Sequence, residues 1–180
     1  MTLPLTFRLP QASISVTRVD SELQDQAAHD FERLFRDIGP VLWRAIYAYS
    51  GGRRVVADDA VAEAFSRALE RRDTIRNPVP WLYRTAFRLA GEEMRTAARL
   101  GPLMEGPAAD EPEEVQGLMK ALRELSPNQR AAIVLHYHAD LPVREVSRLM
   151  GSTVAAVKVH LHRGRRKLRV LLGEEDVADA

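Results

Sequence analysis

Residues 142–172 read PVREVSRLMGSTVAAVKVHLHRGRRKLRVLL, and this stretch decides how the C-terminal part of the chain folds. A short amphipathic helix, a turn at Gly151 and a second, longer amphipathic helix form the helix-turn-helix pattern. In the second helix one face is apolar, while the opposite face is small at its start and basic towards its end. From Lys158 to Arg169 there are six basic residues and no acidic residue. A helix face of this kind is typical of a recognition helix in the DNA major groove.

The outer face of this second helix predicts two kinds of DNA contact. Its first turns would meet base edges, and the guanidinium groups further along would hold phosphates. Because basic helix faces are commonly just solvated, a face without a nucleic-acid partner is the alternative interpretation. The apolar face consists of Val154, Val157, Leu161, Gly164 and Leu168. The residues that we expect to contact duplex DNA are Thr153, Ala155, Ala156, Lys158, Val159, His162, Arg163 and Arg166.

The rest of the chain also reads as helices, because no strand-like alternation persists anywhere. We therefore expect an all-α fold of two small helical domains joined by an acidic flexible linker, with the helix-turn-helix in the C-terminal domain. The expected boundaries are a mobile N-terminal tail at 1–28, a first helical domain at 29–99, the linker at 100–114, the second domain at 115–172 and an acidic tail at 173–180.

Helix starts are predicted from proline and capping residues. A capping box at 126–129, with proline at the first helical position, opens one helix of the second domain. In the first domain we expect Pro40 to separate a short helix from a second one, and Asp58 to cap the helix after that. Pro80 suits the first position of the long helix that follows it.

This long helix carries a second basic stripe. At about 100° per residue, an indole and four guanidinium groups fall within about 60° of one another, and mostly apolar residues cover the other side. An arginine row headed by an indole suits a nucleic-acid strand, since the charges track phosphates and the ring stacks on an unstacked base. The alternative is that Trp81 belongs to the core and that the arginines pair with neighbouring carboxylates. The stripe consists of Trp81, Arg84, Arg88, Arg95 and Arg99.

Nothing in the sequence completes a catalytic or metal site. Asp58, Asp59 and Glu63 cluster at a helix start, where a cap or a partner-binding surface is favoured because no histidine or further acid is spaced to complete a metal site. Histidines two positions apart point to different sides of a helix and do not chelate together. The absence of cysteine excludes disulfides, Cys-ligated zinc, iron–sulfur clusters and a thiol nucleophile. We expect no catalytic residue, metal or cofactor.

Charge and hydropathy limit the partners and the cellular compartment that we expect. The net charge of +1 conceals a segment at 126–169 that carries +7, set between segments at 100–125 and 170–180 that carry −4 each. A free chain with this near-neutral net charge is not expected to bind DNA non-specifically. No apolar run approaches the ~18 residues of a membrane span, and the N-terminal pattern is not that of a secretory signal. We therefore expect a cytoplasmic protein without membrane insertion.

Five segments resemble the sigma factors of bacterial RNA polymerase, of the extracytoplasmic-function type. They are DDAVAEAF (58–65), WLYRTA (81–86), LSPNQR (125–130), VLHY (134–137) and the helix-turn-helix at 143–165. The family keeps two helical domains, called region two and region four, and the resemblance runs from about residue 30 to residue 171. The chain departs from the family at four positions, where glutamine, asparagine, aspartate and a small polar residue are commoner: Ala62, Arg88, Glu92 and Val159.

The resemblance implies a subunit that binds core RNA polymerase and directs promoter-specific, DNA-templated transcription initiation. Region two would dock on the polymerase clamp through Asp59, Glu63 and Phe65. Region four would read the minus-thirty-five element of promoter DNA and touch the polymerase flap, while the acidic linker would thread towards the active-centre channel. The melted minus-ten strand would be held by the loop at 72–80 and the helix after it, through Arg76, Trp81, Arg84, Arg88 and Arg95. An anti-sigma factor is a further partner that the family admits, and the chain itself would make or break no bond.

Two other functions remain open at this point. A stand-alone helix-turn-helix transcriptional regulator would use only the C-terminal module, with an N-terminal helical partner-binding domain, and would not need the basic stripe of the long helix. A metal-dependent enzyme would be built on Asp58, Asp59, Glu63 and Glu92, and it would require bound metal.

Overall fold

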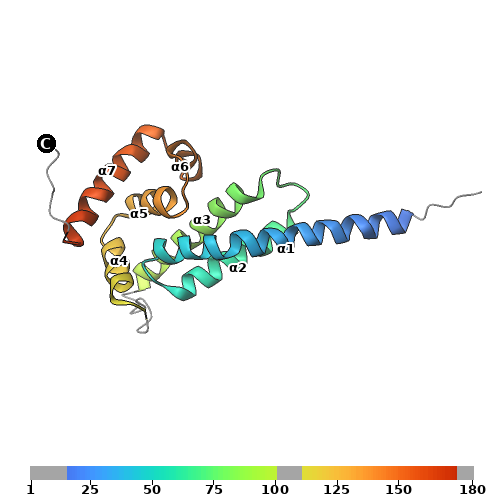
Figure 1. The fold of residues 1–180 in the computed structure, drawn as a ribbon, viewed down its shortest axis with the longest axis horizontal. Coiled ribbons are helices and arrows are strands. Elements are labelled where there is room, and N and C mark those ends of the chain that lie inside the picture. Colours follow the sequence, from blue (N-terminus) through green and yellow to red (C-terminus); the bar gives the residue numbers. More distant parts are fainter. Residues whose placement is uncertain (1–15, 101–110, 174–180) are drawn as a thin grey trace, which may run out of the picture.

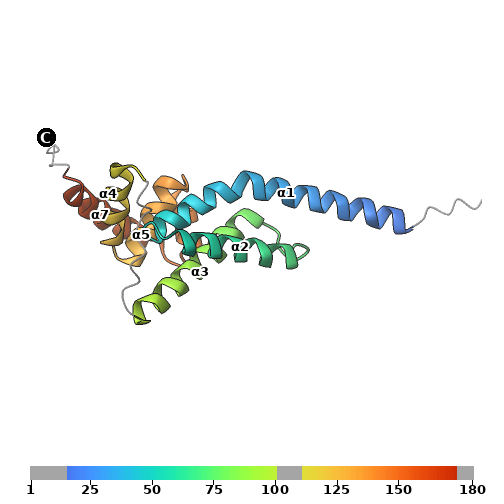
Figure 2. The ribbon, with the colours of Figure 1, turned by 90° about the horizontal axis from the view of Figure 1, so that it is seen from below.

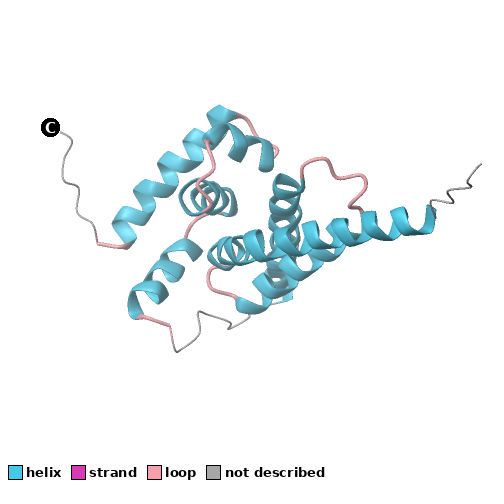
Figure 3. Cartoon of the chain, turned by 45° about the vertical axis from the view of Figure 1, so that its right-hand side comes forward, coloured by secondary structure: helices cyan, strands magenta, loops and turns pink. Residues whose placement is uncertain are grey.

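The computed structural model describes residues 16–100 and 111–173. Within these ranges every regular element is a helix, which confirms the all-α prediction (Figures 1 and 3). The elements are α1 (Val16–Tyr49), α2 (Arg54–Glu70), α3 (Pro78–Leu100), α4 (Glu113–Arg123), α5 (Pro127–Ile133), a π-helix η1 (Val134–His138), α6 (Val143–Leu149) and α7 (Val154–Leu171).

Helices α1, α2 and α3 form the N-terminal module, in which α2 packs against both of the others. The N-terminal part of α1 extends beyond α2 and α3 as a projecting rod (Figure 2). The apolar stripes of the three helices meet along the other part of α1, and their interior side chains are completely inaccessible to solvent. These side chains are Leu42, Ala45, Ile46, Ala57, Ala64, Leu82, Ala86 and Ala90.

Helix α1 is longer and more continuous than the sequence predicts. It begins at Val16, inside the expected tail at 1–28, and it passes through Pro40 without a break. Proline in a helix interior costs ~3 kcal/mol, because it lacks the backbone N–H and crowds the preceding turn. Packing on both sides of Pro40 offsets that cost, because Phe35 before it and Leu42 after it both pack within the N-terminal module. The Phe35 ring packs edge-on against Phe65 of α2, with the ring centroids 4.8 Å apart.

The starts of α2 and α3 also differ from the expectation. Helix α2 begins at Arg54, after an N-cap Arg53 that makes no side-chain capping bond. Asp58 therefore lies inside the helix, where its carboxylate accepts a hydrogen bond from the Trp43 indole N–H (2.6 Å). Helix α3 begins at Pro78, so Pro80 occupies its first turn and not its first position. Proline is tolerated there because the first backbone N–H groups of a helix have no partner within it.

Helices α4 to α7 form the C-terminal module and contain the predicted helix-turn-helix. The capping box is confirmed: the Ser126 hydroxyl accepts from the backbone of Gln129 (3.4 Å), and the Gln129 side chain accepts from the backbone of Ser126 (3.2 Å). The turn between α6 and α7 contains Gly151 at φ +60°, a conformation that glycine adopts at little cost. Val146 of α6 and Val157 of α7 are both 0% exposed, so this pair of helices shares one interior.

Gly164 permits the close crossing of α7 over α5. A Cβ atom added to Gly164 would lie 2.9 Å from Cγ1 of Ile133, which is closer than side chains normally approach. We expect Gly164→Ala to destabilise the protein by ~1–3 kcal/mol through overpacking. Gly117→Ala is the matched control, because nothing lies within 4 Å of its added Cβ in α4, and it should stabilise the chain by ~0.5–1 kcal/mol. Urea unfolding followed by circular dichroism measures both, and equal stabilisation by the two variants would contradict the close crossing.

The two modules pack against each other, and the view of Figure 3 shows them side by side. Helix α1 contacts α4 and η1, and α3 contacts α6. The buried side chains of the two modules consequently form one continuous cluster in the described part of the chain. Residues 101–110 of the expected linker lie outside the described residues. No described helix is both long and apolar enough to cross a membrane.

Candidate nucleic-acid and polymerase interfaces

The outer face of α7 has the geometry expected of a recognition helix. The Thr153 hydroxyl accepts a hydrogen bond from the backbone N–H of Ala156 (3.1 Å), so the Thr153 side chain caps the first turn of α7. Val159 is 46% exposed in the middle of the face. Among the residues that we expected to contact duplex DNA, Ala156 is half-buried, and the exposed ones are Thr153, Ala155, Lys158, Val159, His162, Arg163 and Arg166.

The opposite face of α7 packs on α5 and α6, with one difference from the expectation. Val157 and Leu161 are buried, and Gly164 lies against α5. Val154, which we expected in the apolar stripe, is 39% exposed. Val154 is the first residue of the helix, one turn ahead of the buried Val157, and it lies outside the contact with the rest of the module. The N-terminal turn of α7 therefore stands clear of the module on more than one side.

The basic stripe of α3 also faces outward. Arg84, Arg88, Arg95 and Arg99 are exposed, while Leu82, Ala86, Ala90 and Ala97 on the other side of the helix are buried. The Trp81 indole at the head of the stripe is half-buried and packs against the core with part of its surface. Arg76 is exposed in the loop between α2 and α3. The helix thus brings together the stripe that the sequence predicts, with Trp81 shared between core and surface.

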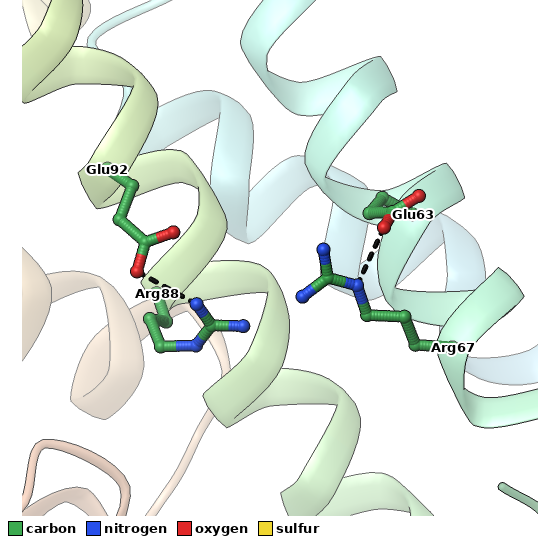
Figure 4. Close-up of polar contacts among 4 residues, drawn as sticks. All are labelled: Glu63, Arg67, Arg88 and Glu92. Carbon is green, nitrogen blue, oxygen red and sulfur yellow. Dashed lines mark hydrogen bonds and ion pairs between the residues drawn. The ribbon is translucent and has the colours of Figure 1, made fainter.

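Two arginines of the stripe have partners within the protein. The Arg88 guanidinium donates to the Glu92 carboxylate one turn along α3 (2.8 Å), and both side chains are about half exposed (Figure 4). The Arg84 guanidinium donates to the backbone carbonyl of Arg148, at the end of α6 (3.2 Å). An exposed ion pair of the first kind contributes at most ~1 kcal/mol, so it leaves Arg88 available to another anion. The contact of Arg84 is different, because it joins the two modules.

The acidic side chains of α2 form a separate exposed surface. Asp59 and Glu63 lie one turn apart on the same side of the helix, and both are exposed. The Glu63 carboxylate accepts a bond from the Arg67 guanidinium, 2.6 Å away (Figure 4). In Figure 4 the guanidinium groups of Arg67 and Arg88 point towards each other from α2 and α3.

Phe65 does not belong to this surface. It is 4% exposed, and its ring packs edge-on against Phe31 (6.0 Å between centroids) and Phe35 (4.8 Å) of α1. The expectation that Phe65 touches a partner directly is therefore corrected. The ring holds α2 against α1, and it thereby helps to fix the position of the helix that carries Asp59 and Glu63.

The described residues contain no group of three side chains arranged to hold a metal ion. Asp58 is bonded to the Trp43 indole, which the Arg54 guanidinium covers at 5.6 Å from the ring centroid. His136 Nδ1 lies 2.7 Å from the carbonyl of Leu141. Burial, and secondarily the positive charge of Arg44, lower the pKa of His138. Asp58 and His136 are thus engaged in contacts within the protein.

Arg130 has a set of contacts that the sequence did not predict. Arg130 of α5 is only 9% exposed, and its guanidinium donates to the carbonyls of Tyr49 (3.1 Å), Arg123 (3.1 Å) and Leu125 (3.2 Å). Burial lowers the pKa of Arg130, although a guanidinium keeps its charge at any physiological pH. The only signal in the sequence is that this arginine directly precedes the apolar run at 131–135.

Comparisons with known proteins bear on both modules. The family model described as Sigma-70 region 2 matches residues 34–100, and the one described as Sigma-70, region 4 matches residues 116–168. The ECF RNA polymerase sigma factor BldN of Streptomyces coelicolor is 28% identical over 189 residues, which cover 93% of this chain and 71% of BldN.

The chain belongs to the extracytoplasmic-function sigma factors.

Further relatives agree with this assignment. The sigma factor CarQ of Myxococcus xanthus is 27% identical over 164 residues, covering 84% of this chain and 94% of CarQ. The structure of CnrH in complex with the cytosolic domain of CnrY has a TM-score of 0.64 and 27% identity, covering 87% of this chain and 99% of that one. The fold is also that of the sigma factor RpoE of Bartonella quintana, crystallised with the anti-sigma factor NepR (TM-score 0.71, 24% identity, 82% and 99% coverage).

As a sigma factor, the chain directs transcription initiation by RNA polymerase. Region 2 runs from residue 34, within α1, to the end of α3, and region 4 comprises most of α4 to α7. Because both regions match, the alternative of a stand-alone helix-turn-helix regulator is not favoured. Sigma factors are in general non-enzymatic DNA-binding initiation factors.

Proposed function

We propose that this sigma factor reads duplex promoter DNA with α7 of region 4 and holds the melted strand with α3 of region 2. One observation carries the proposal: α7 starts at a capped, exposed turn and presents Lys158, Arg163 and Arg166, none of which has a carboxylate partner among the described residues. Unneutralised guanidinium groups on one helix face are available for phosphates.

In region 4 the small side chains of the first turns would let α7 approach base edges in the minus-thirty-five element. Ala155 and Val159 are exposed and apolar, and they suit thymine methyl groups. His162, one turn further, would donate or accept a hydrogen bond at a base or a phosphate. Arg163 and Arg166 would fix the register of the helix through the DNA backbone.

In region 2 the exposed stripe of α3 would follow the melted strand of the minus-ten element. Trp81 offers an aromatic surface for one unstacked base, and Arg76, Arg84, Arg88 and Arg95 offer charge for phosphates. Capturing extruded bases would offset the few kcal/mol that their unstacking costs. The mechanism is therefore binding energy used for strand separation, and we infer that the chain makes or breaks no covalent bond.

The acidic surface of α2 would bind core RNA polymerase. Asp59 and Glu63 are exposed on one side of a helix whose other side is fixed in the core by Phe65. Region 4 would make a second contact at the polymerase flap, and the acidic linker would run between the two regions. A subunit that works on the chromosome with polymerase would act in the cytoplasm.

An anti-sigma factor is a further proposed partner. CnrH and RpoE, whose folds this chain shares, were solved with CnrY and with the anti-sigma factor NepR respectively. A groove of about 570 Å³ between α1, α4 and η1 is lined mostly by apolar side chains, including Tyr47, Leu118, Met119 and Ile133. Such a groove would receive the apolar side of a partner helix.

Removing one phosphate-binding charge from α7 tests the assignment of region 4. We expect Arg166→Ala to weaken holoenzyme binding to minus-thirty-five duplex roughly evenly across sequences, and to reduce the slope of log K against log salt by about one. Fluorescence anisotropy over a salt series measures both quantities. Arg71→Ala, which removes an exposed charge from the end of α2, should change neither. A loss confined to certain sequences would show that Arg166 reads a base.

A further inference from the structure

Two arginines face each other across the packed helices α2 and α3 of region 2. Arg67 of α2 donates to Glu63, one turn back on the same helix (2.6 Å). Arg88 of α3 donates to Glu92, one turn further on its own helix (2.8 Å). In Figure 4 the two guanidinium groups point towards each other and lie between the two carboxylates. Two positive groups thus meet between the helices, with the negative groups on their far sides.

Core packing holds these like charges in place. Helices α2 and α3 pack against each other, and alanines on their buried sides are at most 2% exposed: Ala64, Ala68, Ala86 and Ala90. Small side chains at a contact let two helix axes approach closely. In the described part of the chain, no salt bridge joins either guanidinium to a carboxylate of the other helix. Because like charges repel, this arrangement favours an anion between the two groups.

Both guanidinium groups have donors to spare for such an anion. A guanidinium carries five N–H groups. Arg67 donates to Glu63 through Nε, which leaves both of its terminal nitrogens, and Arg88 donates through one terminal nitrogen. The side chains of Arg67 and Arg88 are 35% and 49% exposed, so a ligand can reach these donors from solvent. Exposed ion pairs contribute little to stability, so neither glutamate prevents its arginine from binding a second anion.

The position of Arg88 indicates which anion this is. Arg88 belongs to the basic stripe of α3, and it follows Trp81 by seven residues, which is roughly 10 Å along the helix axis. A single strand carries one phosphate at every nucleotide, so a strand that stacks a base on Trp81 and runs along the stripe would bring a phosphate to Arg88. Arginine at position 88 is one of the departures from the family, in which asparagine is commoner. The facing guanidinium groups are therefore a feature of this chain.

We propose that Arg67 and Arg88 together bind one phosphate of the melted strand, with each guanidinium donating to a non-bridging oxygen. The inference rests on the proposed role of α3, and it adds Arg67 of α2 to the strand-binding surface. A planar guanidinium suits phosphate because its N–H groups match the spacing of two oxygens. Contact from two helices fixes the strand sideways on region 2, which a row of charges along one helix does not do.

Uncharged linkages in the melted strand test this phosphate site. A forked DNA is built from a promoter mapped with wild-type holoenzyme, and one phosphate at a time in its single strand is replaced by methylphosphonate. We expect one linkage at which the replacement weakens binding of wild-type holoenzyme about tenfold, because hydrogen bonds between charged groups are the stronger kind. Arg67→Gln and Arg88→Asn should each weaken binding to unmodified DNA about tenfold. Each should also remove most of the extra loss at that same linkage and at no other, which fluorescence anisotropy measures.

Two further variants separate contact with the phosphate from other effects. Lys120→Gln is the matched control, because it removes one exposed charge from α4 of region 4, and it should bind every DNA as the wild type does. Arg67→Lys keeps the charge but not the planar fork. It should bind unmodified DNA more weakly than the wild type and still respond to the shared linkage. Urea unfolding of each variant reports whether it is folded.

The outcomes distinguish the phosphate site from the proposed function. If Arg88→Asn lost its response at one linkage while Arg67→Gln kept it, the paired site would be overturned and the role of α3 would stand. Loss of co-purification with core polymerase by a folded Arg67→Gln variant would assign Arg67 to the polymerase contact and also overturn the site. If wild-type holoenzyme bound all the modified strands equally well, the proposed role of α3 would be refuted, and the phosphate site with it.

Discussion

Replacement of Trp81 by alanine is expected to reduce promoter opening by about 5- to 150-fold, because stacking of one base on an aromatic ring contributes ~1–3 kcal/mol. The indole stands at the head of the α3 stripe and is half-buried, so one part of it packs on region 2 while the other part is open to a base. Binding of closed duplex through α7 should be unchanged. Permanganate reactivity of the melted strand measures opening, and a gel-shift assay on the minus-thirty-five duplex measures closed binding.

Trp81→Phe is the matched variant, since a phenyl ring keeps a stacking surface in the same place. We expect it to recover a large part of the lost opening. The free energy of unfolding is measured for both variants, because a half-buried indole also contributes to packing. Equal losses in opening and in closed binding, together with a drop in stability that phenylalanine does not repair, would make Trp81 a core residue and remove it from the strand-binding face.

The features of this fold that depend on neighbouring residues could be predicted from the sequence. The capping box of Ser126 and Gln129 and the exposed basic face of α7 each involve side chains within a few turns of one another. Helical periodicity also separated the exposed side of α3 from its buried side. The residues of the candidate site on α7 could be predicted in this way because they all lie on one helix, close together in the sequence.

The features that depend on distant residues could not be predicted. Arg130 contacts the carbonyl of Tyr49, 81 positions away, and no periodicity reports such a pair. The lack of a side chain at Gly51 makes room for Arg123 of α4, 72 positions away, and no local pattern reports this contact either. Packing against α2 holds α1 continuous through Pro40, which local propensity would have broken. Phe65 was assigned to a surface by its place in a motif, whereas the rings of α1 cover it.

Charge reversal on α2 is expected to abolish stable association with core polymerase. Asp59 and Glu63 are both exposed and lie one turn apart, so Asp59→Lys with Glu63→Lys replaces the acidic surface by a basic one. Like charges placed against each other across an interface cost several kcal/mol, which corresponds to a loss in affinity of at least about 100-fold. Co-purification with core polymerase and run-off transcription measure the effect. Duplex binding by the free chain should remain, because α7 lies in the other region.

The Glu70→Lys, Asp73→Lys variant is the matched control, since it changes the net charge equally at two exposed positions, one at the C-terminal end of α2 and one in the loop after it. It should associate with core polymerase as the wild type does. Phe65→Ala distinguishes a direct polymerase contact from a role in stabilising the fold. Removal of a buried ring costs ~3–5 kcal/mol of stability, so the variant should lose polymerase binding only in proportion to the fraction of protein that unfolds. Loss of binding by a fully folded Phe65→Ala variant, with the charge-reversed protein still bound, would move the polymerase contact away from the acidic surface. The two variants together therefore decide whether charge on α2, or the ring beneath it, makes the contact.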